Sequence, residues 1–437
     1  MAINMKAIAV IFFTFFLTTV YGQTDDYKVL LDSAKTLFKH EESLYNLGQK
    51  EPGKSNYYQI VFLLERVIEL NPDNSEARYF LGYTYSRINS EDGRDMVDMN
   101  LDLLYKTSEQ FENVIKLTPK YTDEIIILDP YSKLTAEWGS MAMGYWYNNK
   151  VDSAIWAFRE GKNRGGFGNF ILEYNKKVLD ACSEKAILIS SGDNTIFPLL
   201  YWQIAENYRT DATVIDINLL HTDWYPAFLS KNKLVLFDLP DEILDTIQHT
   251  KWADTTITIN DFSWTVKPSY YNQYLLRGDR VFLSLLKENK FERDIFFASG
   301  FPEDSKLSLE NYLTSFIIVD KLITSKKQIQ TYEDYKGSIT HFLQLSEHLN
   351  LNSSDELKIY DIFRYNILMH ITNHSNDNEE KEVKELLDIL DKYGNSKKYP
   401  YENPKVEEYE NYLRQIFQET TPTYKNETKK RRNGKQR

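Results

Sequence analysis

Apolar residues recur at helical spacing through about the first 170 residues, and the clearest stretch predicts two facing antiparallel helices. On each helix, small and large side chains alternate along the face that packs against the other helix. These positions are Trp138, Ala142 and Tyr145 on the first helix, and Ala154 and Phe158 on the second. Short side chains at such positions let two helices cross closely, so the stretch predicts a tightly packed helical pair.

An interrupted copy of this pattern comes earlier in the chain. Leu81, Gly82 and Tyr85 lie on its first helix. An insertion around 90–99 separates them from the second helix, which carries Phe111. The insertion falls between the two helices, where a longer loop costs little free energy. The copy therefore predicts a second helical pair in front of the first.

A third, weaker copy covers 47–72, so that residues 25–168 resemble the tetratricopeptide-repeat family. In that family helix pairs stack and bury a continuous core, and the concave side of the stack usually binds a protein partner. The resemblance implies such a binding face here, lined by Tyr79, Tyr83 and 145–147. In the alternative interpretation, these aromatic residues only pack between neighbouring repeats.

The pattern changes to short apolar runs typical of strands after a glycine-rich stretch at 165–168. That stretch follows a helix, so it is interpreted as an interdomain turn and not as a phosphate-binding loop. The expected strands lie at 186–190, 213–217, 234–237, 256–259 and 294–298, with helices at 195–208 and 274–288. Because strands and helices alternate, we expect a small, mostly parallel α/β sheet with right-handed crossovers.

Polar residues gather directly after the first two expected strands. They are Asp193 and Asn194 after the first strand, and Asn218, His221, Asp223 and Trp224 after the second. Ligands of parallel sheets bind beyond the carboxyl ends of the strands, so these residues are the candidate ligand-binding site. If the two strands are neighbours, Asp193 and Asp223 share one crevice. The alternative is that Asp193 and Asn194 cap one helix and that Asp223 caps the next.

The acidic character of this candidate site decides which ligands fit. A carboxylate about 4 Å from a phosphate charge costs about 4 kcal/mol at an effective dielectric constant of about 20, whereas a helix N-terminus attracts an anion by only about 1 kcal/mol. Sugars fit better than nucleotides, because carboxylates and amides bond hydroxyl groups while Trp224 offers a stacking surface. The sequence has no cofactor motif, and His370 and His374 lack the further ligands of a metal site.

Several short stretches also resemble a second family. Residues 191–198 read SGDNTIFP, 208–211 read YRTD and 216–225 read DINLLHTDWY, and the match continues at 276–279, 291–298 and 309–313. Over 183–323 the chain is similar to the soluble C-terminal region of bacterial multi-pass membrane proteins related to protein O-mannosyltransferases.

This second resemblance implies a cell-envelope and glycan context. It also implies a ligand role for Asp193, Asn194 and Asp223. Thr195 stands where the family has an aspartate, and His221 stands where an asparagine is usual. The membrane-embedded acids of the family have no counterpart in this sequence, so the resemblance carries over no catalytic residue.

The N-terminus has the pattern of a signal peptide at 1–22. Lys6 precedes an apolar run at 7–20, and Val20 and Gly22 are small enough for cleavage after residue 22. The run is shorter than the roughly 20 residues that span a bilayer, so we expect no transmembrane segment after cleavage. The alternative is an uncleaved anchor. The pattern predicts an exported protein, either periplasmic or secreted.

Charge and cysteine content narrow the range of partners. The formal net charge is −12, so binding to nucleic acid is not expected. A basic tail at 421–437 is expected to be disordered and solvated, and contact with anionic lipid is the alternative. Cys182 is the only cysteine, which excludes a disulfide bond within the chain.

Helical periodicity returns at 330–418. We therefore expect an α plus α/β protein, with tetratricopeptide-like repeats at 23–168, a small, mostly parallel α/β domain at 169–325 and a helical region at 326–420. The expected function is that of an exported envelope protein that binds a protein partner through its repeats. The alternative is an accessory module that binds a glycan or glycolipid in envelope glycosylation. The sequence leaves open whether the crevice is catalytic.

Overall fold

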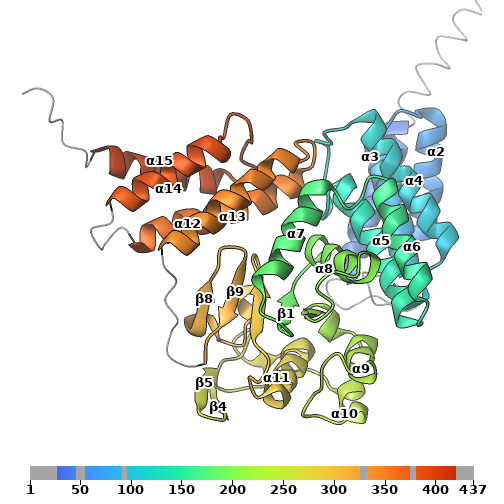
Figure 1. Ribbon diagram of the computed structural model, residues 1–437. Helices are drawn as coiled ribbons and strands as arrows, with labels where there is room; N and C mark the ends of the chain where they lie inside the picture. The colour runs from blue at the N-terminus through green and yellow to red at the C-terminus, as the bar shows by residue number, and fades with distance from the viewer. Residues whose placement is uncertain (1–26, 46–54, 91–95, 325–331, 375–379, 420–437) are drawn as a thin grey trace, which may run out of the picture.

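The computed structural model describes residues 27–45, 55–90, 96–324, 332–374 and 380–419 (Figure 1). The signal peptide expected at 1–22 and the basic tail expected at 421–437 lie outside them. Helices, a mixed sheet and further helices follow one another along the chain, which confirms the α plus α/β fold class. Within the described residues, no helix is both long and apolar enough to cross a membrane.

The N-terminal helices, which together we call the helical array, each pack on the next one along the chain. They are a helix over 27–45, α2 (Tyr57–Leu70), α3 (Ser75–Ser90), α4 (Leu101–Leu117), α5 (Pro130–Tyr147) and α6 (Val151–Asn163). α2 packs on α3, α3 on α4, α4 on α5 and α5 on α6. The array therefore has the succession of packed helices that the apolar spacing predicts.

Two glycines allow the helices of the array to cross closely. A Cβ atom at Gly82 of α3 would lie 2.8 Å from the Phe111 ring of α4. A Cβ atom at Gly161 of α6 would lie 2.4 Å from the Cβ atom of Trp138 on α5. Beside these crossings the residues singled out by spacing are mostly buried: Leu81, Tyr85, Ala142, Ala154 and Phe158 are buried, and Tyr145 is half-buried.

A five-stranded mixed sheet follows the array, with the strand order β2-β1-β7-β9-β8. The strands are β1 (Ile187–Ser190), β2 (Thr213–Asp216), β7 (Ile295–Ala298), β8 (Leu313–Ser315) and β9 (Val319–Leu322). β2, β1 and β7 are parallel, as the alternating pattern predicts. β9 and β8 extend the sheet in antiparallel fashion, which the pattern does not predict. The candidate site therefore lies at the carboxyl ends of two neighbouring parallel strands, β1 and β2.

The prediction of a strand at 234–237 is wrong. The Leu234 carbonyl accepts hydrogen bonds from the Arg293 guanidinium at 3.0 Å and from the Thr213 hydroxyl at 3.2 Å. These side chains satisfy the backbone oxygen that a neighbouring strand would otherwise bond. An apolar run alone therefore did not identify a strand here.

The strand expected at 256–259 exists but lies outside the main sheet. It is β4 (Thr255–Ile259), and it pairs with β5 (Phe262–Val266) as a separate antiparallel hairpin. β3 (Thr250–Lys251) and β6 (Tyr274–Leu275) form another small antiparallel pair. The chain therefore leaves the parallel sheet between β2 and β7 and builds two small ribbons beside it.

Five helices surround the sheet. They are α7 (Asn169–Ala181), α8 (Asp193–Leu200), α9 (Trp224–Lys231), α10 (Asp241–Thr246) and α11 (Arg277–Asn289). α8 is shorter than expected and continues as a single π-helical turn, Tyr201–Ala205. Pro198 lacks an N–H group, so it cannot bond the carbonyl of Asn194 one turn earlier. The buried amide of Asn175 on α7 donates to that carbonyl instead, at 3.0 Å.

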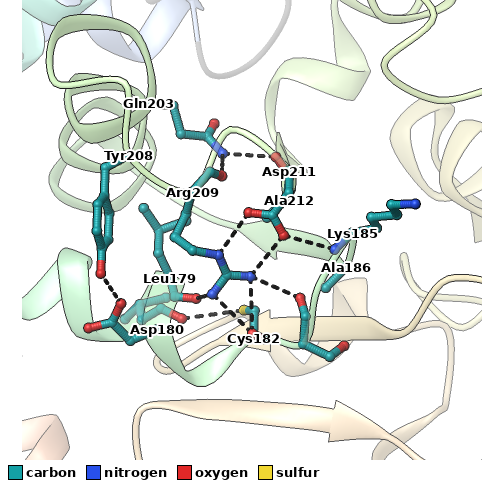
Figure 2. A network of polar contacts seen from close by, with 12 residues as sticks. Leu179, Asp180, Cys182, Lys185, Ala186, Gln203, Tyr208, Arg209, Asp211 and Ala212 are labelled. Carbon is teal, nitrogen blue, oxygen red and sulfur yellow. Dashed lines mark hydrogen bonds and ion pairs between the residues drawn. The ribbon is translucent and has the colours of Figure 1, made fainter.

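Arg209 joins the end of α7 to the amino end of the sheet (Figure 2). Its guanidinium donates to the carbonyl oxygens of Leu179, Cys182 and Ser183 at 2.5 to 3.2 Å. Leu179 lies in the last turn of α7 and the other two residues directly follow the helix, where a cation favours the negative end of the helix dipole. The hydrogen bond from Arg209 lowers the pKa of Asp211 to about 2. This part of the sequence motif at 208–211 therefore has a structural role.

The C-terminal helices pack back on the sheet. They are α12 (Tyr332–Gln344), α13 (Ser354–His374), α14 (Glu380–Tyr393) and α15 (Pro404–Glu419). The side-chain amide of Asn366 on α13 donates to the Ile317 carbonyl, just before β9, at 2.7 Å. This contact fixes α13 to the antiparallel edge of the sheet.

α13 also meets the start of α5, and the two helices cap one another. Asp129 accepts hydrogen bonds from the N–H of Ser132 in α5 at 2.9 Å and from the N–H of Asp355 in α13 at 3.0 Å. Asp355 accepts the N–H of Asp129 in return, at 2.7 Å, and the Ser353 hydroxyl donates to Asp129 as well. Each carboxylate satisfies N–H groups that have no partner within a helix. The helical array and the C-terminal helices are therefore joined directly.

We predict that Gly161→Ala destabilises the protein. Alanine normally stabilises a helix interior relative to glycine by about 1 kcal/mol, but here the new Cβ would overlap Trp138. Overpacking of this kind costs about 1 to 3 kcal/mol, to be measured as a lower midpoint of urea unfolding.

The matched control for this prediction is Gly337→Ala on α12, where a Cβ atom meets nothing within 4 Å. It should stabilise the protein slightly or leave it unchanged. Equal effects of the two substitutions would contradict the proposed close crossing of α5 and α6.

Candidate functional site

A cavity of about 410 Å³ lies where the carboxyl ends of β1 and β2 face α3 and α5. Its polar lining comes from both sides: Gly192, Asp193, Asp216 and Asn218 from the sheet side, and Ser90, Lys133, Glu137 and Ser140 from the helical array. Met96, Ile196 and Phe197 contribute apolar surface. The cavity therefore lies where parallel sheets usually bind their ligands, and the helical array forms its opposite wall.

Asp216, the last residue of β2, holds the two loops of the sheet side together. Its Oδ1 accepts the N–H groups of Asn218 at 2.8 Å and Leu219 at 3.2 Å, and its Oδ2 accepts that of Gly192 at 3.0 Å. Gly192 has a φ of +87°, a conformation that other residues rarely adopt. Burial raises the pKa of Asp216 to about 7, although the three N–H groups oppose the shift.

Asp193 is the first residue of α8, and its carboxylate lines the cavity. Gly192 occupies the cap position, and no side chain caps this helix. Among the described residues, the Asp193 carboxylate has no hydrogen bond or ion pair. Burial raises its pKa; nearby Lys133 lowers the pKa, while Glu137 raises it further. Asp193 is thus a half-buried acid that lines the cavity without a partner among the described residues.

Lys133 and Glu137 form the charged part of the opposite wall, one turn apart on α5. The Lys133 ammonium lies 2.7 Å from Glu137 Oε1, and the Ser86 hydroxyl donates to the same oxygen at 2.6 Å. Lys133 also lies 4.7 Å from the centre of the Tyr83 ring. Glu137 is 2% exposed, and its Oε2 atom has no hydrogen-bond partner in the part of the chain that the structure describes.

The electrostatics of the cavity favour a ligand that donates hydrogen bonds. Among the described residues that line the cavity, Asp193, Asp216 and Glu137 are acidic and only Lys133 is basic. A buried acceptor without a donor costs about 1 to 3 kcal/mol, so a ligand that donates a hydrogen bond to Glu137 Oε2 recovers that energy. A phosphate group would add a further negative charge and would be repelled.

Two of the sequence-predicted site residues, Asp193 and Asn218, line this cavity. Asn194 is directed elsewhere, since its amide donates to the Ser132 hydroxyl of α5 at 2.9 Å. Asn218 donates to the Ser191 hydroxyl at 3.1 Å. Of the two predicted residues that follow β1, Asp193 thus lines the cavity and Asn194 contacts the array.

The other three predicted residues lie outside the cavity. Asp223 is 83% exposed, 3.8 Å from Arg277. His221 Nδ1 accepts the N–H of Gly278, and Trp224 packs against the Tyr147 ring at 5.4 Å between ring centres. Asp193 and Asp223 therefore do not share a crevice. The alternative, in which Asp193 and Asn194 cap α8 and Asp223 caps α9, is wrong as well. No side chain makes a cap hydrogen bond at the start of either helix.

The second acid of the cavity is Asp216, which the sequence analysis did not single out. Asp216 falls within the expected strand at 213–217, where it ends an apolar run. An aspartate whose carboxylate bonds the N–H groups two and three residues later forms a common turn. An Asp-x-Asn sequence at the end of a buried strand was the available signal.

Two of the aromatic residues expected to line a concave binding face, Tyr79 and Tyr83, are instead covered by another segment of the chain. Tyr79 and Tyr83 are buried, and their hydroxyl groups both donate to the Leu128 carbonyl, at 2.7 and 3.2 Å. They also accept the N–H groups of Ile126 and Leu128. The segment at 121–129 therefore lies along this face of α3, and the tyrosines are contact residues between the array and its own linker.

The comparison with known families gives one match. Residues 171–233 match the model of TMEM260-associated domain 2. This span carries a TMEM260-associated domain. It contains β1, α8 and β2, and with them Asp193 and Asp216. No curated protein matches the chain. The sheet side of the cavity is therefore made by the TMEM260-associated domain, and the opposite wall by the helical array.

The described parts of the chain contain no group of three or more His, Cys, Asp or Glu side chains arranged to hold a metal ion. The acids of the cavity are spread over both walls, and one of them, Asp216, already accepts three N–H groups.

We predict that Asp216 makes the protein less stable as the pH rises. Its folded-state pKa of about 7 exceeds the unfolded value of about 3.9, so the folded state holds a proton that the unfolded chain releases. The contribution is complete below about pH 4 and is lost as the pH rises to about 7, by at most about 4 kcal/mol. Urea unfolding across this range should show a shallower pH dependence for Asp216→Asn.

Asp211→Asn is the control for this experiment. The pKa of Asp211 is lowered to about 2, so its contribution is lost only as the pH falls below about 4. This variant should keep the slope of the unaltered protein between about pH 5 and pH 7. An unchanged slope in Asp216→Asn would show that Asp216 is ionised in the folded protein.

Proposed function

We propose that the protein is an exported accessory module of envelope glycosylation, and that its cavity binds a hydroxyl-rich ligand such as part of a glycan. The observation that carries this proposal is that two acids on opposite walls of one cavity, Asp193 and Glu137, have carboxylate oxygens without a partner among the described residues; of these, Glu137 Oε2 is fully buried. The signal-peptide pattern at 1–22 supports export. The TMEM260-associated domain and the resemblance to O-mannosyltransferase-related proteins support the glycan context.

The chemistry of the lining suits a sugar ring. Asp193 and Glu137 accept hydrogen bonds from hydroxyl groups, while Ser90, Ser140 and Asn218 can both donate and accept. Ile196, Phe197 and Met96 offer apolar surface to the C–H groups of the ring. The volume of about 410 Å³ lies within the range of small-molecule sites.

Binding, and not catalysis, fits the arrangement of the acids. Glycoside chemistry usually needs two carboxyl groups that both reach the sugar and flank the bond to be broken. Both oxygens of Asp216 are engaged by backbone N–H groups. Only Asp193 among the acids of the sheet side is free to contact a ligand. We therefore assign the cavity a recognition role.

A second candidate function is that of a scaffold whose tetratricopeptide-like helices bind a protein partner. The face lined by Tyr79 and Tyr83 is covered by 121–129, so this partner would use another surface. Tyr58 and Phe62, one turn apart on α2, are 71% and 69% exposed. Two large aromatic side chains on one exposed face favour a protein contact there.

We predict that Asp193→Asn weakens glycan binding at least about tenfold, since it removes a charged acceptor from the cavity. The measurement is calorimetric titration with oligosaccharides released from envelope glycoproteins. Asp223→Asn, which changes an exposed acid outside the cavity, should leave the affinity unchanged. Equal affinities in all three proteins would rule out the cavity as the binding site.

For the second candidate, we predict that the double substitution Tyr58→Ser and Phe62→Ser abolishes capture of a protein partner from envelope extract. Glycan titration of the same variant should be unaffected, because α2 does not line the cavity. A partner that the double variant retains would exclude this face of α2 as its docking site.

A further inference from the structure

The distribution of charge in the cavity specifies its ligand further. In the described part of the lining, Lys133 is the one cation. It pairs with Glu137 Oε1 and donates to the Ser86 hydroxyl at 2.9 Å. Arg87, which lies nearby on α3, is paired with Glu42 at 2.6 Å. No cation therefore contacts Asp193 within the described residues. Lys133 and Arg87 attract the Asp193 charge only from a distance, while Glu137 repels it.

The two free acceptors, Asp193 and Glu137 Oε2, come from different elements. Asp193 is carried by α8 and Glu137 by α5, and each charge raises the free energy of the other across the cavity. A neutral hydroxyl group can donate one hydrogen bond to such an acceptor, but it leaves the charge in place. A primary ammonium group brings three N–H donors and one positive charge. Hydrogen bonds between charged partners are also about twice as strong as neutral ones.

We propose that the cavity selects a sugar bearing a free primary amine, with its ammonium group bound between Asp193 and Glu137. This inference rests on the proposed glycan-binding function and names the class of glycan. The remaining hydroxyl groups of the sugar bond Ser90, Ser140 and Asn218. Sugars in which the amine is acetylated bind less tightly, because the amide has no charge and a single N–H.

Binding of the amine also releases a proton. Burial raises the pKa of Asp216 to about 7, so this carboxyl group titrates near neutral pH. Asp193 on α8 raises this pKa further, and Lys133 and Glu137 on α5 and Arg87 on α3 act in turn on Asp193; the Tyr225 hydroxyl of α9 accepts the Asp216 N–H. An added positive charge among them favours the ionised form of Asp216. A neutral sugar has no such effect.

The test is calorimetric titration of the full-length mature chain at pH 7 with three sugars: glucosamine, N-acetylglucosamine and glucose. We expect glucosamine to bind at least about tenfold more tightly than the other two. Its binding heat should depend on the ionisation enthalpy of the buffer, because a proton is released. Asp193→Asn should bring the affinities of glucosamine and N-acetylglucosamine to within about twofold of each other.

A salt series on the unaltered protein gives an independent measurement. Raising the salt concentration from about 20 mM to about 500 mM should weaken glucosamine binding and leave glucose binding unchanged, since salt screens charge. Asp223→Asn is the matched control variant and should keep the full selectivity for the amine.

The possible failures can be distinguished. Equal binding of the three sugars, or tighter binding of N-acetylglucosamine, would overturn the selection of an amine and leave the glycan-binding function standing. Absence of binding by all three sugars and by the released oligosaccharides would overturn the glycan-binding function, and this inference with it.

Discussion

Burial of α5 on all its sides is the constraint on which the rest of the structure depends. Its first half belongs to the apolar core of the array, through Leu134, while Trp138 and Met141 belong to the core that continues into the sheet and the C-terminal helices. At the contact with α8, a Cβ atom on Gly139 would lie 2.2 Å from the Phe197 ring. A larger residue there would push the array away from the sheet.

The same contact creates the cavity. When α8 packs against α5, the carboxyl ends of β1 and β2 come to face the polar side of α5, where Lys133 and Glu137 lie one turn apart. Neither the TMEM260-associated domain nor the array alone encloses this space. The cavity is therefore a property of the junction, and substitutions that shift one part against the other should change its shape.

Side-chain size at helical spacing was sufficient to predict the array, because crossings such as Gly161 on Trp138 are local in the sequence. The parallel strands β1, β2 and β7 were predicted from buried apolar runs. β8 and β9 were missed, since they are short and partly exposed, and only pairing with β7 makes them strands. The candidate residues named from the sequence follow β1 and β2, where the cavity lies, but Asp216 was not among them. The sequence alone does not show that Asp216, and not Asp223, lines the cavity, because this depends on the geometry of the turn after β2.

The mutual capping of α5 and α13 has a consequence for how the chain matures. Ser353 and Asp129 are 224 residues apart in the sequence, so the first turn of α5 acquires its final partners only when the last quarter of the chain is present. Contacts of such long range form late and slow the final steps of folding. Because a chain is synthesised from its N-terminus, the start of α5 remains without its final partners until α13 has been made.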